Sequence, residues 1–559
     1  MIRKLALLGA AAVAALAING PSYAVGLPVT QVIWVSGSTA LDNAFKHFMI
    51  LAGTSPCAAG SVDTYEDTGK GAIYTKSNNY TVVACTLTAA LGGFAAGSNV
   101  AFVKESNGGS VEGTTPVSLG HTLNFLDPTV AAVVGDNEGD MNCTTNTAAG
   151  AGVQYSVAHD LTFTDHSGCT GTIALHIPDV GLADENPEVY TIGPNATTHA
   201  IIGNLTTNTM FQNMFGIGVS LNLYRALQSM QGLSGTVACP ANSDLLSCMP
   251  SLNKSTIRGL LAAGLDFAGW GTIISSTGVA ITDKSFNGGV NNVSNQVYVC
   301  RRGDTSGTQA AADIYFLNNR CQVTDVGHPD NPTGNQFVQA NQTGPCAGLP
   351  AGETAEDFGC TWTAGAGPAG NASDIVFPGT GTGDVAKCLD AHDSNPATNA
   401  AATFAIGVIA TNNAFGNAGG AAGAGDYRLI AIDHNHPTVQ ALANGTYEWA
   451  MDNVVNVAKT GSAQAIAFQA KLAAISSNAV VIGDLISTQV GDANFGVGGL
   501  FDNYQAGAPL PTGFQGLAAT KTTPTSALTQ LANTNVQNDC ITGISANPSQ
   551  SQQVAEDAP

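Results

Sequence analysis

The chain has 559 residues, enough for at least two globular units at roughly 150 residues per domain. Its 40 acidic residues outnumber the 18 Lys and Arg, giving a formal net charge of −22, so a nucleic-acid partner is not expected. Only 10% of the residues are charged and Gly alone contributes 66, a composition that we associate with proteins working outside the cell.

The N-terminus predicts a secretory signal peptide over residues 1–24. A basic start precedes an apolar run over residues 5–18, and Pro21-Ser-Tyr-Ala24 has the small residues of a cleavage site. The run is too short for a stable membrane span, and no Cys follows it that would carry a lipid. We therefore expect a periplasmic or secreted protein that begins near Val25 and has no membrane anchor.

Twelve Cys in an exported chain predict a framework of disulfides. We expect near neighbours to pair, because each pair would close a polar loop: Cys57–Cys85, Cys143–Cys169, Cys239–Cys248 and Cys346–Cys360. The sequence leaves the pairing of the other four open. No Cys lies in a CxxC motif or at zinc-finger spacing from a His, so a metal site is not expected.

The first predicted unit is a strand that runs into a helix. Residues 29–35 are β-rich, the turn Ser36-Gly-Ser-Thr39 follows, and residues 40–51 have helical spacing with Ser38 or Thr39 as the N-cap. A strand that leads into a capped helix is half of an α/β unit.

Later segments continue this alternation. Strands are predicted over 99–103, 172–177 and 295–300, and helices over 255–264 and 309–317. Strand- and helix-like segments resume at 403–410, 427–432 and 464–474. The apolar stretch 214–223 is expected to be buried or to cross between lobes. The turn-rich, Cys-containing stretches 110–178 and 320–372 are interpreted as insertions, the first of them a β-hairpin or loop, and residues 57–98 as a further insertion.

Three strand ends carry Gly and small hydroxyl residues, a pattern typical of anion-binding turns. They are Gly37-Ser-Thr-Ala40, Ser106-Asn-Gly-Gly109 and Thr305-Ser-Gly-Thr308. Helix N-termini and consecutive backbone amides present unpaired N–H groups and partial positive charge to such an ion. Arg302, four residues before Ser306, would add a planar, permanently charged guanidinium.

These motifs resemble those of periplasmic phosphate-binding proteins that serve ABC importers. Arg302-Gly-Asp-Thr-Ser-Gly-Thr308 is similar to that family's R-x-x-x-S-G-T segment, and Asp179-Val-Gly-Leu-Ala-Asp184 resembles its D-x-G-x-S-D loop. The turns at 37–40 and 106–109 resemble its first phosphate loop and its Ser-Gly-Gly loop. The similarity runs discontinuously from about residue 30 to 475.

The resemblance implies an α/β fold, the two-lobed type 2 periplasmic-binding-protein fold with hinge strands and inserted loops. Lobe I would comprise residues 27–220 plus 430–505, and lobe II residues 221–429 with the insertion 320–372. Residues 506–559 are expected to form a weakly ordered C-terminal tail.

The resemblance also implies inorganic phosphate bound between the lobes, without catalytic residues, cofactor or metal. The phosphate-binding residues would be Thr39, Ala40 through its backbone, Ser106, Asp184, Arg302, Ser306, Gly307 and Thr308. The Asp184 carboxylate would accept a hydrogen bond from the proton that phosphate still carries near neutral pH. It would repel sulfate, which carries no proton. The implied partner is an inner-membrane ABC importer, and the protein is expected to be a monomer.

Two other classes of function stay open. A surface or structural protein on the same fold would fit the Gly/Ala-rich composition, the insertions and the tail. An exported phosphatase would need a nucleophile or a metal site. The sequence nominates neither for it at the cleft. Separately, His434 and His436 beside Pro437 could bind a metal, and the acidic turn Asp136, Glu138 and Asp140 could hold Ca²⁺, although it lacks the Gly and distal Glu of an EF-hand. Both patterns favour solvated loops. Arsenate, with a similar shape and proton, is a variant of the phosphate hypothesis.

Overall fold

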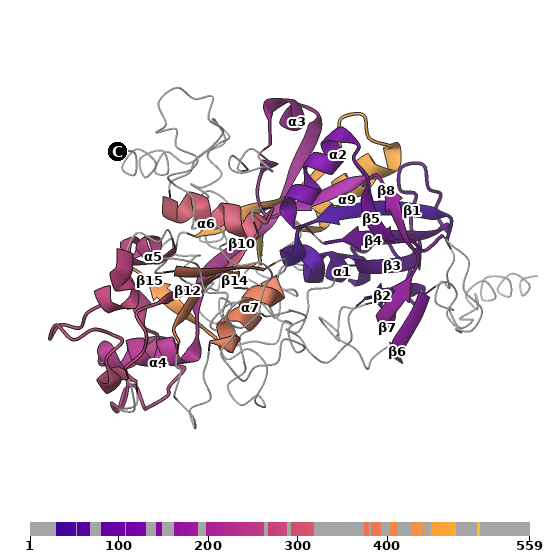
Figure 1. Cartoon of the computed structure of the whole chain (residues 1–559). Helices are drawn as coiled ribbons and strands as arrows, with labels where there is room; N and C mark the ends of the chain where they lie inside the picture. The colour runs from indigo at the N-terminus through magenta and orange to yellow at the C-terminus, as the bar shows by residue number, and fades with distance from the viewer. Residues whose placement is uncertain are drawn as a thin grey trace, which may run out of the picture.

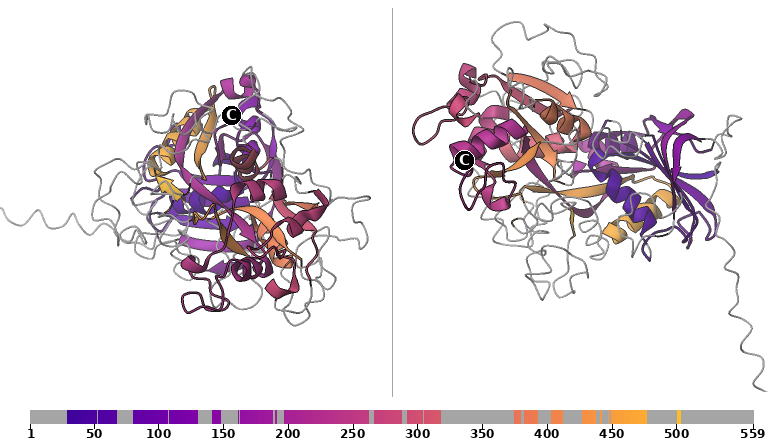
Figure 2. Two further views of the ribbon diagram at one scale, coloured as in Figure 1. Left: turned by 90° about the vertical axis from the view of Figure 1, so that its left-hand side faces the viewer. Right: turned by 90° about the horizontal axis from the view of Figure 1, so that it is seen from below.

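The structure of the chain, a computed structural model, shows two α/β lobes lying side by side (Figures 1 and 2). It describes residues 29–67, 80–129, 141–147, 161–317, 374–392, 403–411, 427–476 and 500–502, apart from single residues and short stretches within these ranges. No helix in these ranges is long and apolar enough to cross a membrane.

The first lobe is built on a mixed sheet with the strand order β10-β16-β9-β1-β4-β3-β2-β7-β6. Its elements are β1 (Gln31–Gly37), η1 (Thr39–Leu41), α1 (Asp42–Ile50), β2 (Val62–Glu66), β3 (Tyr80–Thr86), β4 (Asn99–Glu105), η2 (Ser110–Gly113), α2 (Thr115–Leu119), β5 (Leu123–Leu126), β6 (Met141–Thr147), β7 (Phe163–Gly171), β8 (Ile173–His176), β9 (Val180–Ala183), α3 (His199–Gly203), β16 (Ala450–Ala458) and α9 (Ala463–Ser476).

Both faces of this sheet are covered, as strand β4 shows. Side chains alternate along a strand, so Val100 and Phe102 point to the face that carries α1 and α9, where the Phe102 and Phe468 rings stack at 4.7 Å. Ala101 and Val103 point to the opposite face, into a smaller apolar cluster under β5 and β8. Burial on both faces explains why β4 is a nearly continuous apolar run rather than an alternating one.

The second lobe has the strand order β13-β12-β14-β10-β15-β11. Its elements are α4 (Leu221–Met230), η4 (Leu246–Cys248), β11 (Ser251–Leu252), α5 (Lys254–Leu261), η5 (Asp266–Thr272), η6 (Lys284–Phe286), β12 (Val297–Arg302), α6 (Gly307–Leu317), β13 (Asp374–Gly379), α7 (Thr382–Ala391), β14 (Ala405–Ala410) and β15 (Arg428–Ile432). The short strand β17 (Leu500–Asp502) pairs with β10.

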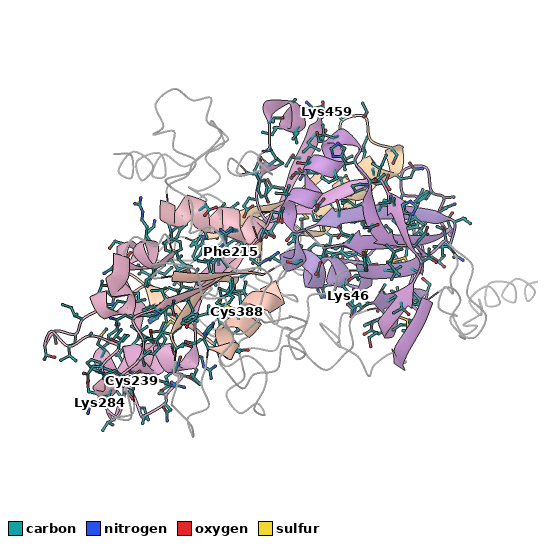
Figure 3. The ribbon with its side chains drawn as sticks, in the orientation of Figure 1. Lys46, Phe215, Cys239, Lys284, Cys388 and Lys459 are labelled. Carbon is teal, nitrogen blue, oxygen red and sulfur yellow. A yellow bond between two sulfur atoms is a disulfide. The ribbon has the colours of Figure 1, made fainter. Side chains whose placement is uncertain are left out.

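Strand β10 (Leu205–Val219) joins the lobes, because residues 205–214 pair with β16 in the first sheet and residues 215–219 with β14 and β15 in the second. The chain returns between β15 and β16, where the Tyr447 hydroxyl donates to Phe215 O at 2.6 Å and Phe215 N–H to Trp449 O at 3.2 Å. Phe215 lies near the junction of the lobes (Figure 3). The predicted fold class, α/β with two lobes and hinge strands, is confirmed.

Two predictions about local structure need correction or extension. Residues 180–183, expected within a loop, form strand β9 inside the first sheet. The stretches 57–98 and 110–178, expected as insertions, supply strands β2, β3, β6 and β7, which extend this sheet at the end away from β10. The predicted leader, the insertion 320–372 and the tail lie outside the described residues, and the residue ranges assigned to the two lobes stay a prediction.

Three predicted disulfides are present: Cys57–Cys85, Cys143–Cys169 and Cys239–Cys248. The fourth predicted pair, Cys346–Cys360, lies outside the described residues. A further disulfide that the sequence did not predict joins Cys300 of β12 to Cys388 of α7 across 88 residues of chain. Framework disulfides of this kind are typical of extracytoplasmic proteins.

Candidate anion-binding site between the lobes

The first-lobe side of the site lies where three neighbouring strands end. Strands β9, β1 and β4 are adjacent and parallel, so their carboxyl ends meet at one edge of the sheet. Ser38 follows β1, Ser106 follows β4 and Asp184 follows β9. This edge of an open α/β sheet is the usual place for ligands.

Close contact between backbones fixes this edge, and it requires glycine. A Cβ on Gly37 would lie 2.0 Å from Leu182 O, one on Gly113 2.2 Å from the same oxygen, and one on Gly181 2.0 Å from Gly113 O. Side chains at these positions would force β1, η2 and β9 apart. The close packing of η2 brings Ser110 to the end of β9, where Asp184 N–H donates to Ser110 Oγ at 3.1 Å.

A buried lysine holds the turn after β1. The Lys104 side chain at the end of β4 is fully buried, and its ammonium donates to Gly37 O at 3.0 Å and Ser38 O at 2.8 Å. It also forms an ion pair with Asp42, and Ser106 Oγ accepts a hydrogen bond from it. The Ser106 hydroxyl in turn donates to Asp42 Oδ1 at 2.6 Å. The Lys104 charge is therefore neutralised within the first lobe.

Asp184 is the acidic group at the centre of the site. It is 2% exposed and accepts hydrogen bonds from the Ser38 hydroxyl and, at 3.4 Å, from the Thr308 hydroxyl of the second lobe. Burial raises the pKa of Asp184, while the hydrogen bond from Ser38 and the Arg302 charge oppose the rise. Burial and the adjacent Asp184 raise the pKa of Glu185 well above its ordinary value.

The second-lobe side is the connection from β12 to α6. Arg302, the last residue of β12, is 2% exposed, and its Nη1 donates to Thr39 Oγ1 of the first lobe at 3.1 Å. Ser306 immediately precedes α6 and is 1% exposed. Its hydroxyl has no hydrogen-bond partner among the residues that the structure describes. The first turn of α6 adds the partial positive charge of a helix N-terminus.

The two lobes touch around these groups. Val111 N–H donates to Thr305 O at 3.1 Å. A Cβ on Gly307 would lie 2.5 Å from Ser110 Oγ and 2.6 Å from Asp184 Cβ, and a Cβ on Gly109 would lie 3.2 Å from Ser306 Cα. Glycine at both positions lets α6 approach the first lobe closely.

The structure brings together most of the predicted site residues. Those that surround Asp184 or bridge the lobes are Thr39, Arg302, Ser306, Gly307 and Thr308. Two others lie at the same edge but are bonded within the first lobe: Ala40 N–H donates to Ser38 Oγ at 3.1 Å, and Ser106 belongs to the Lys104–Asp42 network.

Sequence reasoning missed Lys104, Asp42 and Ser110. It placed Ser38 in the first anion-binding turn and named it as a possible N-cap, but it did not predict the contact of Ser38 with Asp184. Ser38 does cap η1, but its hydroxyl also donates to Asp184. A signal for Lys104 was present, since a lone lysine ends the apolar strand Asn99–Glu105. Asp42 and Ser110 have no comparable signal, because their roles depend on contacts across the sheet.

The other predicted candidates do not join this site. His434 and His436 follow β15, and in the described part of the chain the group of three or more potential metal ligands is a different one: Cys300, Cys388 and His392. Asp136, Glu138 and Asp140 lie outside the described residues.

The chain matches no protein-family model and no curated protein. Among solved structures it is similar to a substrate-binding protein assigned to phosphate ABC transport from Clostridium perfringens, with bound phosphate, at 11% identity, TM-score 0.26 and coverage of 53% of this chain and 73% of that one. An ABC-type phosphate transport receptor from Vibrio cholerae is similar at 11% identity and TM-score 0.24, with coverage of 53% of this chain and 74% of that one. PstS from Borrelia burgdorferi is similar at 9% identity and TM-score 0.22, with coverage of 50% of this chain and 68% of that one. Sequence identities and TM-scores this low do not indicate a shared ligand.

Proposed function

We propose that this chain binds inorganic phosphate between its two lobes and acts as the substrate-binding component of phosphate uptake. The observation that carries the proposal is the position of Asp184. This buried carboxylate lies among donors from both lobes, with the Ser38 and Thr308 hydroxyls bonded to it.

The charges of the site suit an anion that carries a proton. Lys104 is neutralised by Asp42, which leaves Arg302 and the N-terminus of α6 to attract the ion. When ionised, Asp184 can accept a further hydrogen bond from a donor on the ligand, and a monoprotonated phosphate carries one. Sulfate would place a bare oxygen against the carboxylate, so the site would reject it.

The proposed place of action is outside the cytoplasm, supported by the disulfides and by the predicted leader. The proposed activity is binding and release to an ABC importer, not catalysis. Closure of the lobes around the ion would exclude water and strengthen each hydrogen bond to it.

The test is calorimetric titration of the refolded, phosphate-stripped mature protein with phosphate and, separately, with sulfate. Tight phosphate binding without a sulfate signal is expected. Binding of neither ion by a folded protein would overturn the proposal and favour the structural-protein hypothesis. Turnover of a phosphomonoester by metal-supplemented protein would favour the phosphatase hypothesis instead.

The variant Asp184→Asn tests the assigned selectivity. An amide can donate a hydrogen bond, so sulfate binding should appear and the preference for phosphate should fall by roughly tenfold or more, the effect of one charge-assisted hydrogen bond of about 1.5–3 kcal/mol. Asp179→Asn is the matched control, because the Asp179 side chain accepts a hydrogen bond from the backbone N–H of Trp34 at 3.0 Å, and an amide oxygen can still accept it. An unchanged preference in Asp184→Asn would remove Asp184 from the site.

A further inference from the structure

A second cluster of chemically active side chains lies inside the second lobe. Cys300 on β12, Cys388 on α7 and His392 just after α7 place one ligand atom each within 4.8 Å of one another. All three are buried, at 0%, 6% and 1% exposure. Cys388 and His392 are four residues apart, a spacing that puts both on one face at the end of the helix.

His392 is held in the orientation of a metal ligand. Its Nδ1 lies 2.9 Å from Thr403 Oγ1, and its Nε2 has no hydrogen-bond partner within the described ranges. The ring packs against Tyr298 at 4.2 Å between centroids and against Phe377 at 5.6 Å. Histidine ligands commonly give one ring N–H to an oxygen acceptor, which fixes the ring and directs the other nitrogen at the metal.

We propose that Cys300, Cys388 and His392 form a binding site for a thiolate-preferring divalent cation, of the Zn²⁺ type, once the Cys300–Cys388 disulfide is reduced. The cation is identified by the ligand set, because thiolate and imidazole together are typical of zinc. Three protein ligands leave one coordination position for water or another small ligand.

The chemistry balances with a dithiol as the reductant. The S–S bond of Cys300–Cys388 breaks with the uptake of two electrons and two protons, and the dithiol becomes a disulfide. Binding of the cation then releases both thiol protons to water. Two thiolates and a neutral imidazole around a divalent cation carry no net charge, which suits a buried position, whereas a monovalent cation would leave one buried negative charge.

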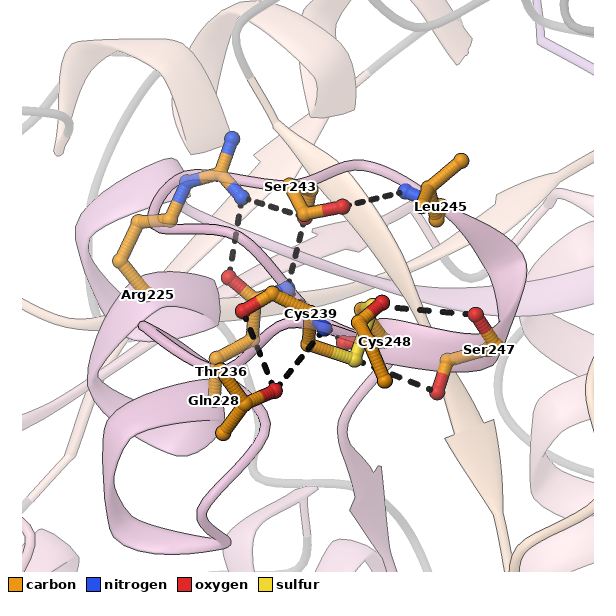
Figure 4. The surroundings of a disulfide bond; sticks show 9 residues. Arg225, Gln228, Thr236, Cys239, Ser243, Leu245, Ser247 and Cys248 are labelled. Atoms are coloured by element: carbon orange, nitrogen blue, oxygen red, sulfur yellow. Dashed lines mark hydrogen bonds between the residues drawn. A yellow bond between two sulfur atoms is a disulfide. The ribbon is translucent and has the colours of Figure 1, made fainter.

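The Cys239–Cys248 disulfide provides an internal contrast (Figure 4). Its sulfurs lie near backbone oxygens and the Ser247 hydroxyl, with Cys239 Sγ 3.8 Å from Ser247 O and Cys248 Sγ 3.5 Å from Ala238 O. No histidine is among the residues drawn and labelled around it. Reduction of this pair should therefore create no three-ligand site.

The test uses the full mature chain, oxidised or reduced with a phosphine, titrated with Co²⁺ as a coloured substitute for Zn²⁺. We expect a thiolate-to-cobalt charge-transfer band at one equivalent in the reduced protein, none in the oxidised protein, and loss of the band when Zn²⁺ is added. Cys300→Ser/Cys388→Ser, which keeps every other cysteine, should abolish the band. Cys239→Ser/Cys248→Ser should keep it.

His392→Ala should weaken Zn²⁺ binding by the reduced protein at least as much as the roughly tenfold loss typical of an outer-shell partner. His434→Ala is the matched control and should leave Zn²⁺ affinity unchanged. The proposal is overturned by a band in oxidised protein, by its survival without Cys300 and Cys388, or by wild-type affinity in His392→Ala. Loss of the far-ultraviolet circular dichroism signal on reduction in the presence of Zn²⁺ would also overturn it, because the site needs β12 and α7 in place.

Discussion

The two sides of the candidate anion site are built differently. On the first-lobe side, Lys104 has acceptors on Gly37, Ser38, Asp42 and Ser106, and glycines lock β1, η2 and β9 together. On the second-lobe side, by contrast, the Arg302 guanidinium and the Thr308 hydroxyl donate hydrogen bonds to Thr39 and Asp184 of the first lobe.

Because of this difference, we expect changes on the first-lobe side to affect stability and changes on the second-lobe side to affect ligand affinity. The first-lobe side is stabilised by contacts within its own lobe, so its removal should destabilise the fold. Under the closure proposed above, the second-lobe side gains its bonds to the first lobe as the lobes close, so its removal should weaken ligand binding and leave the fold intact. A site assembled by closure binds its ligand through the difference in affinity between the open and closed states.

Lys104→Met should give the largest effect, on stability. It leaves the partly buried Asp42 carboxylate without its cation, and loss of one partner of a buried ion pair costs about 3–5 kcal/mol. Urea unfolding should show this decrease in the free energy of unfolding. Lys459→Met, at an exposed position of the first lobe (Figure 3), should change little. Equal stability of both variants would contradict the role assigned to Lys104.

Arg302→Ala should give the largest effect on phosphate affinity. Truncating one side of a buried charge contact costs about 2–4 kcal/mol, or roughly 30-fold to 1,000-fold in Kd. The urea midpoint should stay close to that of the wild type, which would sharpen the contrast with Lys104→Met. Calorimetric titration measures the affinity, and Arg258→Ala on the exposed side of α5 is the control. A large loss of stability in Arg302→Ala would show that both sides of the site are structural.

Gly307→Ala tests whether close approach of α6 is needed. Its Cβ would lie 2.5 Å from Ser110 Oγ and 2.6 Å from Asp184 Cβ, so the lobes would have to separate. Overpacking of this kind costs about 1–3 kcal/mol, which we expect as a roughly 5-fold to 150-fold rise in the Kd for phosphate. Gly303→Ala is a matched control in the same connection, because its Cβ would meet only Gly379 O at 3.9 Å. Equal affinities in the two variants would show that closure tolerates the extra methyl group.

The sequence predicted the second-lobe side of the site better than the first. Arg302 and the turn before α6 are contiguous in the chain, so one motif contains the whole arrangement. The first-lobe side joins residues that are far apart in the sequence, from β1, β4, η2 and β9. No short sequence motif therefore predicts the contact of Lys104 with Asp42 or of Ser110 with Asp184.

The same distinction between local and distant contacts governs the disulfides. Cys57–Cys85, Cys143–Cys169 and Cys239–Cys248 join near neighbours in sequence and were predicted from loop closure. Cys300–Cys388 could not be predicted in this way, because it depends on α7 packing against β12 after a long intervening stretch. Strand β9 was mistaken for part of a loop because four residues are too few to show an alternating pattern.

Glu185→Gln should have the smallest effect, and it reports on the buried carboxyl group next to Asp184. Burial and Asp184 raise the pKa of Glu185 well above 4.5, so the folded chain keeps a proton that the unfolded chain loses. The free energy of unfolding of the wild type should therefore fall as pH rises from about 4.5 through the raised pKa, and this contribution should be fully present below that window.

Glutamine keeps the shape of Glu185 without ionising, so this part of the fall should disappear in urea unfolding measured across the window. Asp283→Asn is the control, since that exposed carboxylate, whose pKa the Ser285 hydrogen bonds lower, is already ionised there. Phosphate affinity should be unchanged in Glu185→Gln below the raised pKa of Glu185, because a protonated glutamic acid and a glutamine are both neutral neighbours of Asp184. A marked change in that affinity would mean that the ligand meets an ionised Glu185, and that the negative charge is shared between the two carboxyl groups rather than held by Asp184 alone.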